Sequence, residues 1–238
     1  MIYVYAIIDR PEVDLPALTG LQDTSLVSLA CQEIAAVYSP IISSGRSPEI
    51  EQTGPNVWKH EEVLEALMTA HTVLPVRFGE IFSNDTAVSG MLSAHYAEYW
   101  ASMLRVRGRV ELSLRVIWKN EADQAPVREP ASPADGKAKT MSGYEYMQAR
   151  LKAENGANAR RHQAEAMALE LEKTLARLVV ESTHQVVLTS HLCLKTAFLI
   201  EKEAVPAFRQ DIENLVPVYP EAHFLLTGPW PAYNFVSV

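Results

Sequence analysis

Histidines and cysteines are the side chains of this sequence that are best suited to bind a metal or to act as nucleophiles. The seven histidines include no HExxH pattern and no paired His/Cys spacing of the kind that zinc requires. His60, His71 and His95 lie on or beside apolar helical stripes, where structural histidines are more common than ligands. Cys31 and Cys193 lie among apolar residues, with no neighbouring charge that would lower a thiol pKa. We therefore expect structural histidines, buried cysteines and no metal site.

Other catalytic patterns are also missing from the sequence. It contains no GxGxxG, no Walker loop and no GxSxG, and its ten glycines are dispersed rather than gathered into a phosphate-binding loop. The adjacent acids Glu61 and Glu62 fall in the first turn of a predicted helix, where carboxylates interact favourably with the helix dipole. We expect no catalytic residues, no cofactor and no enzymatic activity.

The charge balance excludes two classes of partner. The 29 acidic and 21 basic residues give a formal net charge of -8, without a basic block that could neutralise phosphates or hold anionic lipid. The apolar N-terminus meets Asp9 and Arg10 at once and predicts a strand rather than a signal peptide. The uncharged stretch from Ala222 onward is too short and too rich in proline to span a bilayer. We expect a soluble cytoplasmic protein with no nucleic-acid or membrane partner.

The segment 119–143 divides the chain. It holds Pro126, Pro130, Pro133 and Gly136 among small and charged residues and shows no apolar periodicity. We expect a linker or long loop there, between an N-terminal domain at 1–118 and a C-terminal domain at 144–238.

The first predicted domain mixes strands and helices. We expect strands at Ile2–Ile8, Leu26–Cys31, Ile34–Ile42 and Val110–Trp118, and an edge strand within Val73–Phe78 because Pro75 cannot donate to a ladder. One helix presents a stripe from His60 to His71. A second is capped by Asn84-Asp85 and continues through Met103.

The second predicted domain opens with a long helical stretch from about Tyr144 to Val180. Its second half has a coiled-coil-like seam at Ala164, Ala168, Leu171, Leu175 and Leu178, whereas its middle is polar and contains Gly156, so we expect a projecting helical hairpin or a break there. Strands at Gln185–Ser190, Leu194–Glu201 and His223–Leu226 and a helix at Glu203–Val216 complete it. The fold class is therefore α+β, with two ferredoxin-like α+β units, the second with a long helical arm.

Two short segments combine proline, glycine and aromatic residues. Leu74–Gly79 includes Pro75, Arg77 and Phe78, and the C-terminal segment Gly228–Val236 holds three aromatic residues and two prolines. Because proline restricts φ, the C-terminal segment is pre-extended. It either packs on its own domains, which we favour, or offers an exposed apolar strip to a partner.

The same segments resemble the signatures of a known family. Val73–Phe82 is similar to the VLPVRFG signature of the gas vesicle protein GvpF/GvpL family, and Leu226–Phe235 is similar to its TGPWPPYxF terminus, apart from Ala232 where the pattern has proline. The opening Tyr3–Ile7 and the helix at His60–Leu64 also match the layout of that family, with most likeness to GvpF. The candidate partner-binding or family-signature residues are Pro75, Arg77, Phe78, Gly79, Gly228, Pro229, Trp230, Pro231, Tyr233 and Phe235.

The resemblance implies an accessory or minor structural protein of gas vesicles, the hollow protein organelles that give prokaryotic cells buoyancy. Its expected partners are the hydrophobic shell protein GvpA and other gas vesicle accessory proteins, in the cytoplasm during assembly and then at the vesicle. Two other functions stay open. One is an enzyme with a scattered active site near 74–80, built from Arg77, His60 and Glu80. The other is a ferredoxin-like ligand-sensing module.

Overall fold

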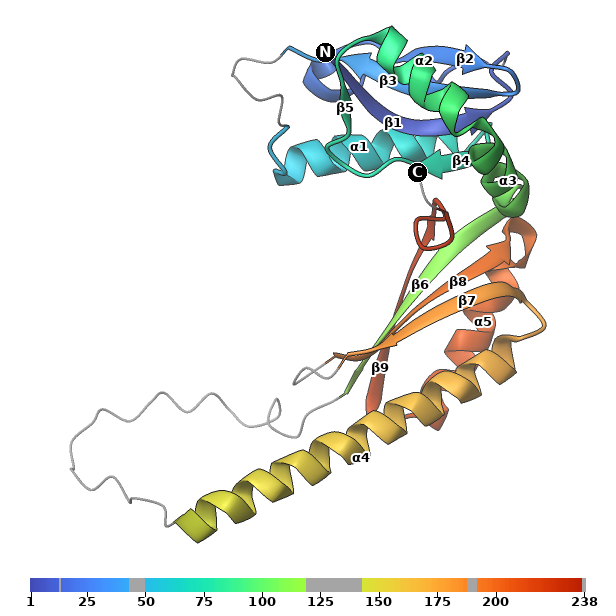
Figure 1. The fold of residues 1–238 in the computed structure, drawn as a ribbon. Coiled ribbons are helices and arrows are strands. Elements are labelled where there is room, and N and C mark those ends of the chain that lie inside the picture. Colours follow the sequence, from blue (N-terminus) through green and yellow to red (C-terminus); the bar gives the residue numbers. More distant parts are fainter. Residues whose placement is uncertain (13, 43–49, 119–142, 188–191, 237–238) are drawn as a thin grey trace. The chain divides into compact units, whose positions relative to one another are not determined.

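The computed structural model describes residues 1–12, 14–42, 50–118, 143–187 and 192–236 (Figure 1). Its contacts divide the chain into two units, and both are discontinuous in sequence. The first comprises Met1–Glu111, Leu199–Lys202 and Gly228–Val238, and the second comprises Leu112–Phe198 and Glu203–Thr227. The C-terminal segment thus makes its contacts in the first unit. The linear division at 118 and 143 stays a prediction, because residues 119–142 lie outside the described ranges.

The first unit is built around an antiparallel sheet with β1 (Ile2–Asp9) at its centre. The strand order is β2 (Val27–Cys31), β3 (Ile34–Pro40), β1, β4 (Val73–Pro75), and β5 (Ile81–Phe82) also pairs with β1. All eight residues of β1 are buried, as expected for an almost uninterrupted apolar strand that is covered on both faces. The hairpin of β2 and β3 and the edge position of the proline-ended strand β4 are confirmed.

Helices cover this sheet. Figure 1 shows α1 (Gly54–Leu67) on one face and α2 (Asp85–Ala94) on the other. The stripe predicted for α1 is confirmed, since His60, Val63, Leu64 and Leu67 are buried, and the helix ends before His71.

The second predicted helix is in fact two. Asn84 caps α2 as expected, with its side-chain oxygen accepting the Ala87 N–H at 3.0 Å. The expectation of one continuous helix through Met103 was wrong, because His95, with φ -112° and ψ 13°, lies outside the helical region. His95 ends α2 and precedes α3 (Tyr96–Val106), so the chain changes direction within one apolar stripe.

The second unit follows a βαββαβ order along the chain. Its elements are β6 (Arg109–Trp118), α4 (Gly143–Leu175), β7 (Val179–Val186), β8 (Leu192–Glu201), α5 (Val205–Leu215) and β9 (Ala222–Trp230), with the short 3-10 turns η3 (Lys202–Ala204) and η4 (Val216–Val218). Three ends of these elements belong to the first unit by their contacts: Arg109–Glu111 of β6, Leu199–Lys202 and Gly228–Trp230 of β9. A further turn, η1 (Leu21–Asp23), also belongs to the first unit. The strands lie in the order β7-β8-β6-β9. The α+β class is confirmed, and the ferredoxin-like detail stays a prediction.

The long helix α4 differs from its prediction. It runs unbroken through Gly156, so both the hairpin and the break expected there were wrong. Glycine costs a helix about 1 kcal/mol relative to alanine, and one such cost does not interrupt a 33-residue helix that is anchored elsewhere. The anchor is the predicted seam of the second half, where Ala164, Ala168, Leu171 and Leu175 are buried.

Some further expectations require correction. The strand predicted at Gln185–Ser190 begins earlier, at Val179, and the last strand continues to Trp230 rather than ending at Leu226. Cys31 is only half-buried, because it ends β2 at the edge of its sheet, with Sγ 3.9 Å from Ser93 Oγ. His191 lies outside the described ranges, as does the side chain of Cys193. No helix among the described residues has the length and hydropathy needed to cross a membrane.

Candidate functional site

The two signature segments meet at one buried histidine of the first unit. The Phe78 ring packs edge-on against His60, with ring centroids 5.7 Å apart, and the Tyr233 hydroxyl lies 3.5 Å from His60 Nε2. Tyr3 and Tyr5, from β1, complete the surroundings of the imidazole. The Tyr3 ring is edge-on to His60 with 5.7 Å between ring centroids, and the Tyr5 ring is stacked on it with 5.6 Å between centroids. We call these five residues, Tyr3, Tyr5, His60, Phe78 and Tyr233, the His60 cluster.

The imidazole of His60 is neutral at physiological pH. The residue is 1% exposed, and burial lowers its pKa to about 4. A neutral ring carries one proton, so one nitrogen donates and the other accepts.

The hydroxyl groups show which nitrogen of His60 carries the proton. Tyr3 Oη lies 2.8 Å from Nδ1 and accepts the Gly79 N–H at 3.3 Å, so its own proton is free to go to Nδ1. Tyr233 donates to Glu61 Oε1 at 3.1 Å, so its oxygen can accept from Nε2, and the ring also hydrogen-bonds to the Val76 backbone. Every donor in this chain has an acceptor, and on that criterion we assign the protons. The network therefore joins both signature segments to β1 and α1.

Gly79 holds this network by its backbone. Its φ is +100°, in the region that favours glycine, and its N–H reaches the Tyr3 hydroxyl. The conformation of the chain between β4 and β5 thus requires the signature glycine.

The C-terminal segment is fastened a second time by a buried carboxylate. Glu111 is 3% exposed, and its two oxygens accept the Asn234 N–H at 2.8 Å and the Asn234 side-chain amide at 2.6 Å. Burial raises the pKa of Glu111, and the hydrogen bonds from Asn234 oppose the shift. Pro231 and Phe235 are also buried, Trp230 and Tyr233 are half-buried and Pro229 is exposed. The segment packs on its own unit, as we favoured.

Sequence reasoning missed the role of Glu111. In β6 the apolar residues Val110, Leu112 and Leu114 alternate, and that alternation places Glu111 on the opposite face, where a solvated acid is expected. The C-terminal segment covers that face instead. A charged residue flanked by apolar residues is a weak signal for such a contact, and nothing local identifies Asn234 as its partner.

The remaining signature residues have different environments. Pro75 is buried at the end of β4, whereas Arg77 is exposed. The three residues considered for catalysis are not brought together by hydrogen bonds in the described chain, since Arg77 and Glu80 are exposed while the His60 ring is enclosed.

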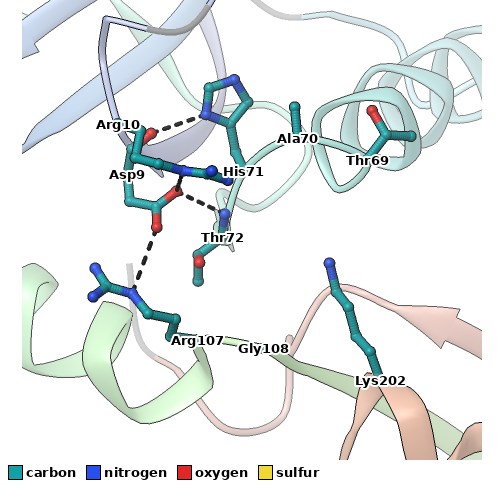
Figure 2. A pocket seen from close by; sticks show the side chains of 9 residues that line it. All are labelled: Asp9, Arg10, Thr69, Ala70, His71, Thr72, Arg107, Gly108 and Lys202. Carbon is teal, nitrogen blue, oxygen red and sulfur yellow. Dashed lines mark hydrogen bonds and ion pairs between the residues drawn. The ribbon is translucent and has the colours of Figure 1, made fainter.

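A second polar site lies at the other end of β1. Figure 2 shows this hollow, of about 410 Å³, around Asp9, His71, Arg107 and Lys202. The Asp9 side chain is 5% exposed. Its Oδ1 accepts the Thr72 N–H at 2.8 Å, and its Oδ2 lies 3.6 Å from Arg107 Nε. His71 Nδ1 donates to the Asp9 carbonyl oxygen at 2.9 Å, while His71 Nε2 is buried without a hydrogen-bond partner among the described residues. We call this site the Asp9 hollow.

Within the described ranges, no three or more histidine, cysteine, aspartate or glutamate side chains are gathered as a metal would require. His184 lies 3.0 Å from the Glu172 carboxylate, and His95 lies 3.2 Å from that of Glu98, so each pairs with a single acid.

Comparisons with known proteins agree on one family. The profile of the family described as gas vesicle synthesis protein GvpL/GvpF matches residues 1–237. Gas vesicle protein F1 of Halobacterium salinarum is 23% identical to the chain, covering 100% of this chain and 93% of its own length. Gas vesicle protein F of a Nostoc species is 26% identical, with 90% and 88% covered.

Solved structures show the same fold. The crystal structure of GvpF from an Anabaena species aligns with a TM-score of 0.76 at 22% identity, covering 100% of this chain and 96% of that one. GvpF from Microcystis aeruginosa aligns with a TM-score of 0.75 at 18% identity, covering 100% and 99%. Together with the two signature segments that meet at His60, the match over residues 1–237 shows that this chain belongs to the GvpL/GvpF family of gas vesicle synthesis proteins.

Proposed function

We propose that this protein acts by binding: it holds the hydrophobic shell protein GvpA, together with other gas vesicle accessory proteins, during vesicle assembly. Membership of a gas vesicle family supports a role at the vesicle. The acidic composition and the exposed apolar side chains of α4 support the finer proposal. In this proposal the binding takes place in the cytoplasm, before the shell closes.

The exposed face of α4 is the observation that carries the proposal. Tyr144, Met147 and Leu151 follow one another at i, i+3 and i+7, and they are 72%, 63% and 55% exposed. Side chains at this spacing share one face of a helix. Figure 1 shows the first half of α4 extending beyond the sheet of its own unit, whereas the second half lies along that sheet.

Such a face suits an apolar helical or extended partner. A helix with a free apolar stripe binds by laying that stripe against a complementary apolar surface. Shell subunits that must build a dry wall expose apolar surface before they assemble, and exposed apolar edges aggregate. A carrier with a net charge of -8 that covers this surface keeps the subunits in solution.

A capture experiment tests the contact. The full chain, co-expressed with GvpA, should retain GvpA on affinity purification, and the double variant Met147→Ser/Leu151→Ser should retain about tenfold less. Leu169→Ser is the matched control, because Leu169 is 56% exposed on the other half of the same helix. Circular dichroism of each variant confirms that the helix is intact. Equal capture by the double variant and the wild type would remove α4 from the proposal, and an absence of capture by the wild type would remove GvpA.

Flotation distinguishes a resident component from a transient one. Buoyant vesicles are washed and immunoblotted before and after collapse by pressure. Signal that survives washing identifies a resident component, and protection from protease until collapse places it inside. Signal confined to the soluble fraction identifies an assembly chaperone that leaves.

A catalytic role near 74–80 is the alternative. The family consists of gas vesicle structural or accessory proteins, which favours binding over catalysis. The candidate partner-binding role of the signature residues stays a prediction, and the exposed side chain of Arg77 is suited to a substitution that tests it.

A further inference from the structure

The Asp9 hollow holds more positive charge than its own carboxylate can neutralise. Arg10, Arg107 and Lys202 line it, and Asp9 is the acidic residue among the lining side chains (Figure 2). This local excess stands out in a chain whose net charge is -8. The nearby carboxylate of Glu201 is already paired with Arg109, at 2.9 Å from Nε.

Both carboxylate oxygens of Asp9 already have partners among the residues that line the hollow. Oδ1 accepts the Thr72 N–H at 2.8 Å and lies 3.6 Å from Arg10 Nε, and Oδ2 lies 3.6 Å from Arg107 Nε. Both arginines approach through Nε at a long distance, and their side chains are 53% and 48% exposed. The Arg107 guanidinium also lies over the Trp100 ring, 5.4 Å from its centroid. Neither contact with Asp9 is made through a terminal guanidinium nitrogen.

Lys202 adds a charge that Asp9 does not account for. It follows the last residue of β8, and its ammonium donates to the Met68 carbonyl oxygen at 3.0 Å. An ammonium has three protons, so two remain for other acceptors. The backbone N–H of Lys202 donates to Gly108 O at 2.9 Å, which fixes this residue against the chain that precedes β6.

A purely structural explanation accounts for only part of the site. A buried carboxylate needs a cationic or hydrogen-bonding partner, and Thr72 with one arginine would supply it. The second arginine and the lysine place more positive charge around the same volume than Asp9 neutralises. The volume of the hollow, about 410 Å³, is within the usual range for small-molecule pockets.

We propose that the Asp9 hollow binds a phosphate-type oxyanion, either free or carried by a nucleotide. Three cations against one carboxylate leave an excess of two, which matches the charge of about -2 that a phosphate group bears near neutral pH. The arginines provide planar donor pairs for phosphate oxygens, and Lys202 provides a mobile point charge. Gly108, with φ +74°, lines the wall without a side chain.

Titration of the full chain tests the proposal. Inorganic phosphate, and separately ATP, are added at ionic strength held constant with sodium chloride, while calorimetry and the melting temperature are followed. We expect saturable binding by the wild type, and an affinity at least about tenfold lower for Arg10→Gln and for Lys202→Gln. Lys59→Gln is the matched control, because Lys59 belongs to the same unit but pairs with Glu62 at 2.6 Å, away from the hollow. It should bind as the wild type does.

Each outcome decides the matter. Binding of both probes identifies the free oxyanion as sufficient, and binding of ATP alone identifies the nucleotide as the source of the phosphate. The proposal is overturned if neither probe saturates, if chloride at equal ionic strength has the same effect, or if Arg10→Gln and Lys202→Gln bind as tightly as the wild type. The melting temperatures without probe show that the variants are folded.

Discussion

The His60 cluster and the Asp9 hollow place two similar histidines in different chemistry. His60 and His71 are eleven residues apart, belong to one apolar stripe in the sequence, and are 1% and 2% exposed. Around His60, aromatic rings enclose the imidazole and both nitrogens have partners. Around His71, cations line an open volume and one nitrogen has no partner among the described residues.

The difference separates a site that holds the fold from one with capacity for a ligand. A buried polar network in which every group is satisfied rigidifies its surroundings and has nothing left to bind. The exposed cations around the hollow exceed its one carboxylate and leave positive charge available to an anion. The signature segments are therefore explained largely by the fold, while the Asp9 hollow, which neither signature includes, has the unmet binding capacity.

Removal of the two imidazoles should give the largest contrast. His60→Ala should lower the free energy of unfolding by about 3 kcal/mol, because it leaves a cavity among aromatic rings and removes the hydrogen bonds of the imidazole with Tyr3 and Tyr233. His71→Ala should cost about 1 kcal/mol, since it loses one hydrogen bond beside an existing hollow. Equilibrium unfolding in urea measures both. Equal losses would contradict the distinction between the two sites.

Acid should act on the His60 cluster next. The pKa of His60 is lowered to about 4 in the folded protein against 6.5 in the unfolded chain, so the unfolded chain binds more protons between these values. The contribution of His60 to the free energy of unfolding is fully present above pH 6.5. It decreases by about 1.4 kcal/mol per pH unit as the pH falls from 6.5 towards 4. Glu61 and Glu111 act with the opposite sign, because burial raises their pKa.

The variant His60→Gln isolates this term, since it keeps hydrogen-bonding groups but does not titrate. The difference in unfolding free energy between wild type and variant should grow smaller as the pH falls from 6.5 to 4.5. NMR titration of the His60 ring provides a check that needs no variant. A ring pKa near 6.5 in the native protein would show that the cluster is open to water.

Loss of the second anchor should have a smaller effect. Glu111→Ala should lower the free energy of unfolding by about 2 kcal/mol, because the C-terminal segment then loses both hydrogen bonds from Asn234 to a charged acceptor. The Asn234 amide should also exchange its hydrogen faster. Glu221→Ala, at an exposed acid, is the control and should change neither quantity. Unchanged exchange in Glu111→Ala would show that the His60 cluster holds the C-terminal segment unaided.

A substitution in the Asp9 hollow should have the smallest effect on stability. Arg10→Gln should change the unfolding free energy by less than about 0.5 kcal/mol, because the side chain is 53% exposed and its ion pair with Asp9 is 3.6 Å long. The urea midpoint without added phosphate measures this. A loss comparable to that of His60→Ala would make Arg10 part of the fold and weaken the case for a ligand.

Local sequence was sufficient for most of the elements. The apolar run of β1, the alternation in β6, the stripe of α1 and the Asn84 cap are short-range patterns, and the structure contains each of them. The errors occurred where a distant contact or the length of an element outweighed local propensity. The break at His95 and the unbroken α4 through Gly156 are the clearest examples.

The candidate sites divide in the same way. The two signature segments and their order along the chain are visible in the sequence, and they were enough to indicate the family. Their meeting at His60 is not visible, because Phe78 and Tyr233 are more than 150 residues apart. The burial of Glu111 and the gathering of Arg10, Arg107 and Lys202 also join segments that no local pattern relates. Periodicity is a property of neighbouring residues, whereas a site depends on which faces the folded chain brings together.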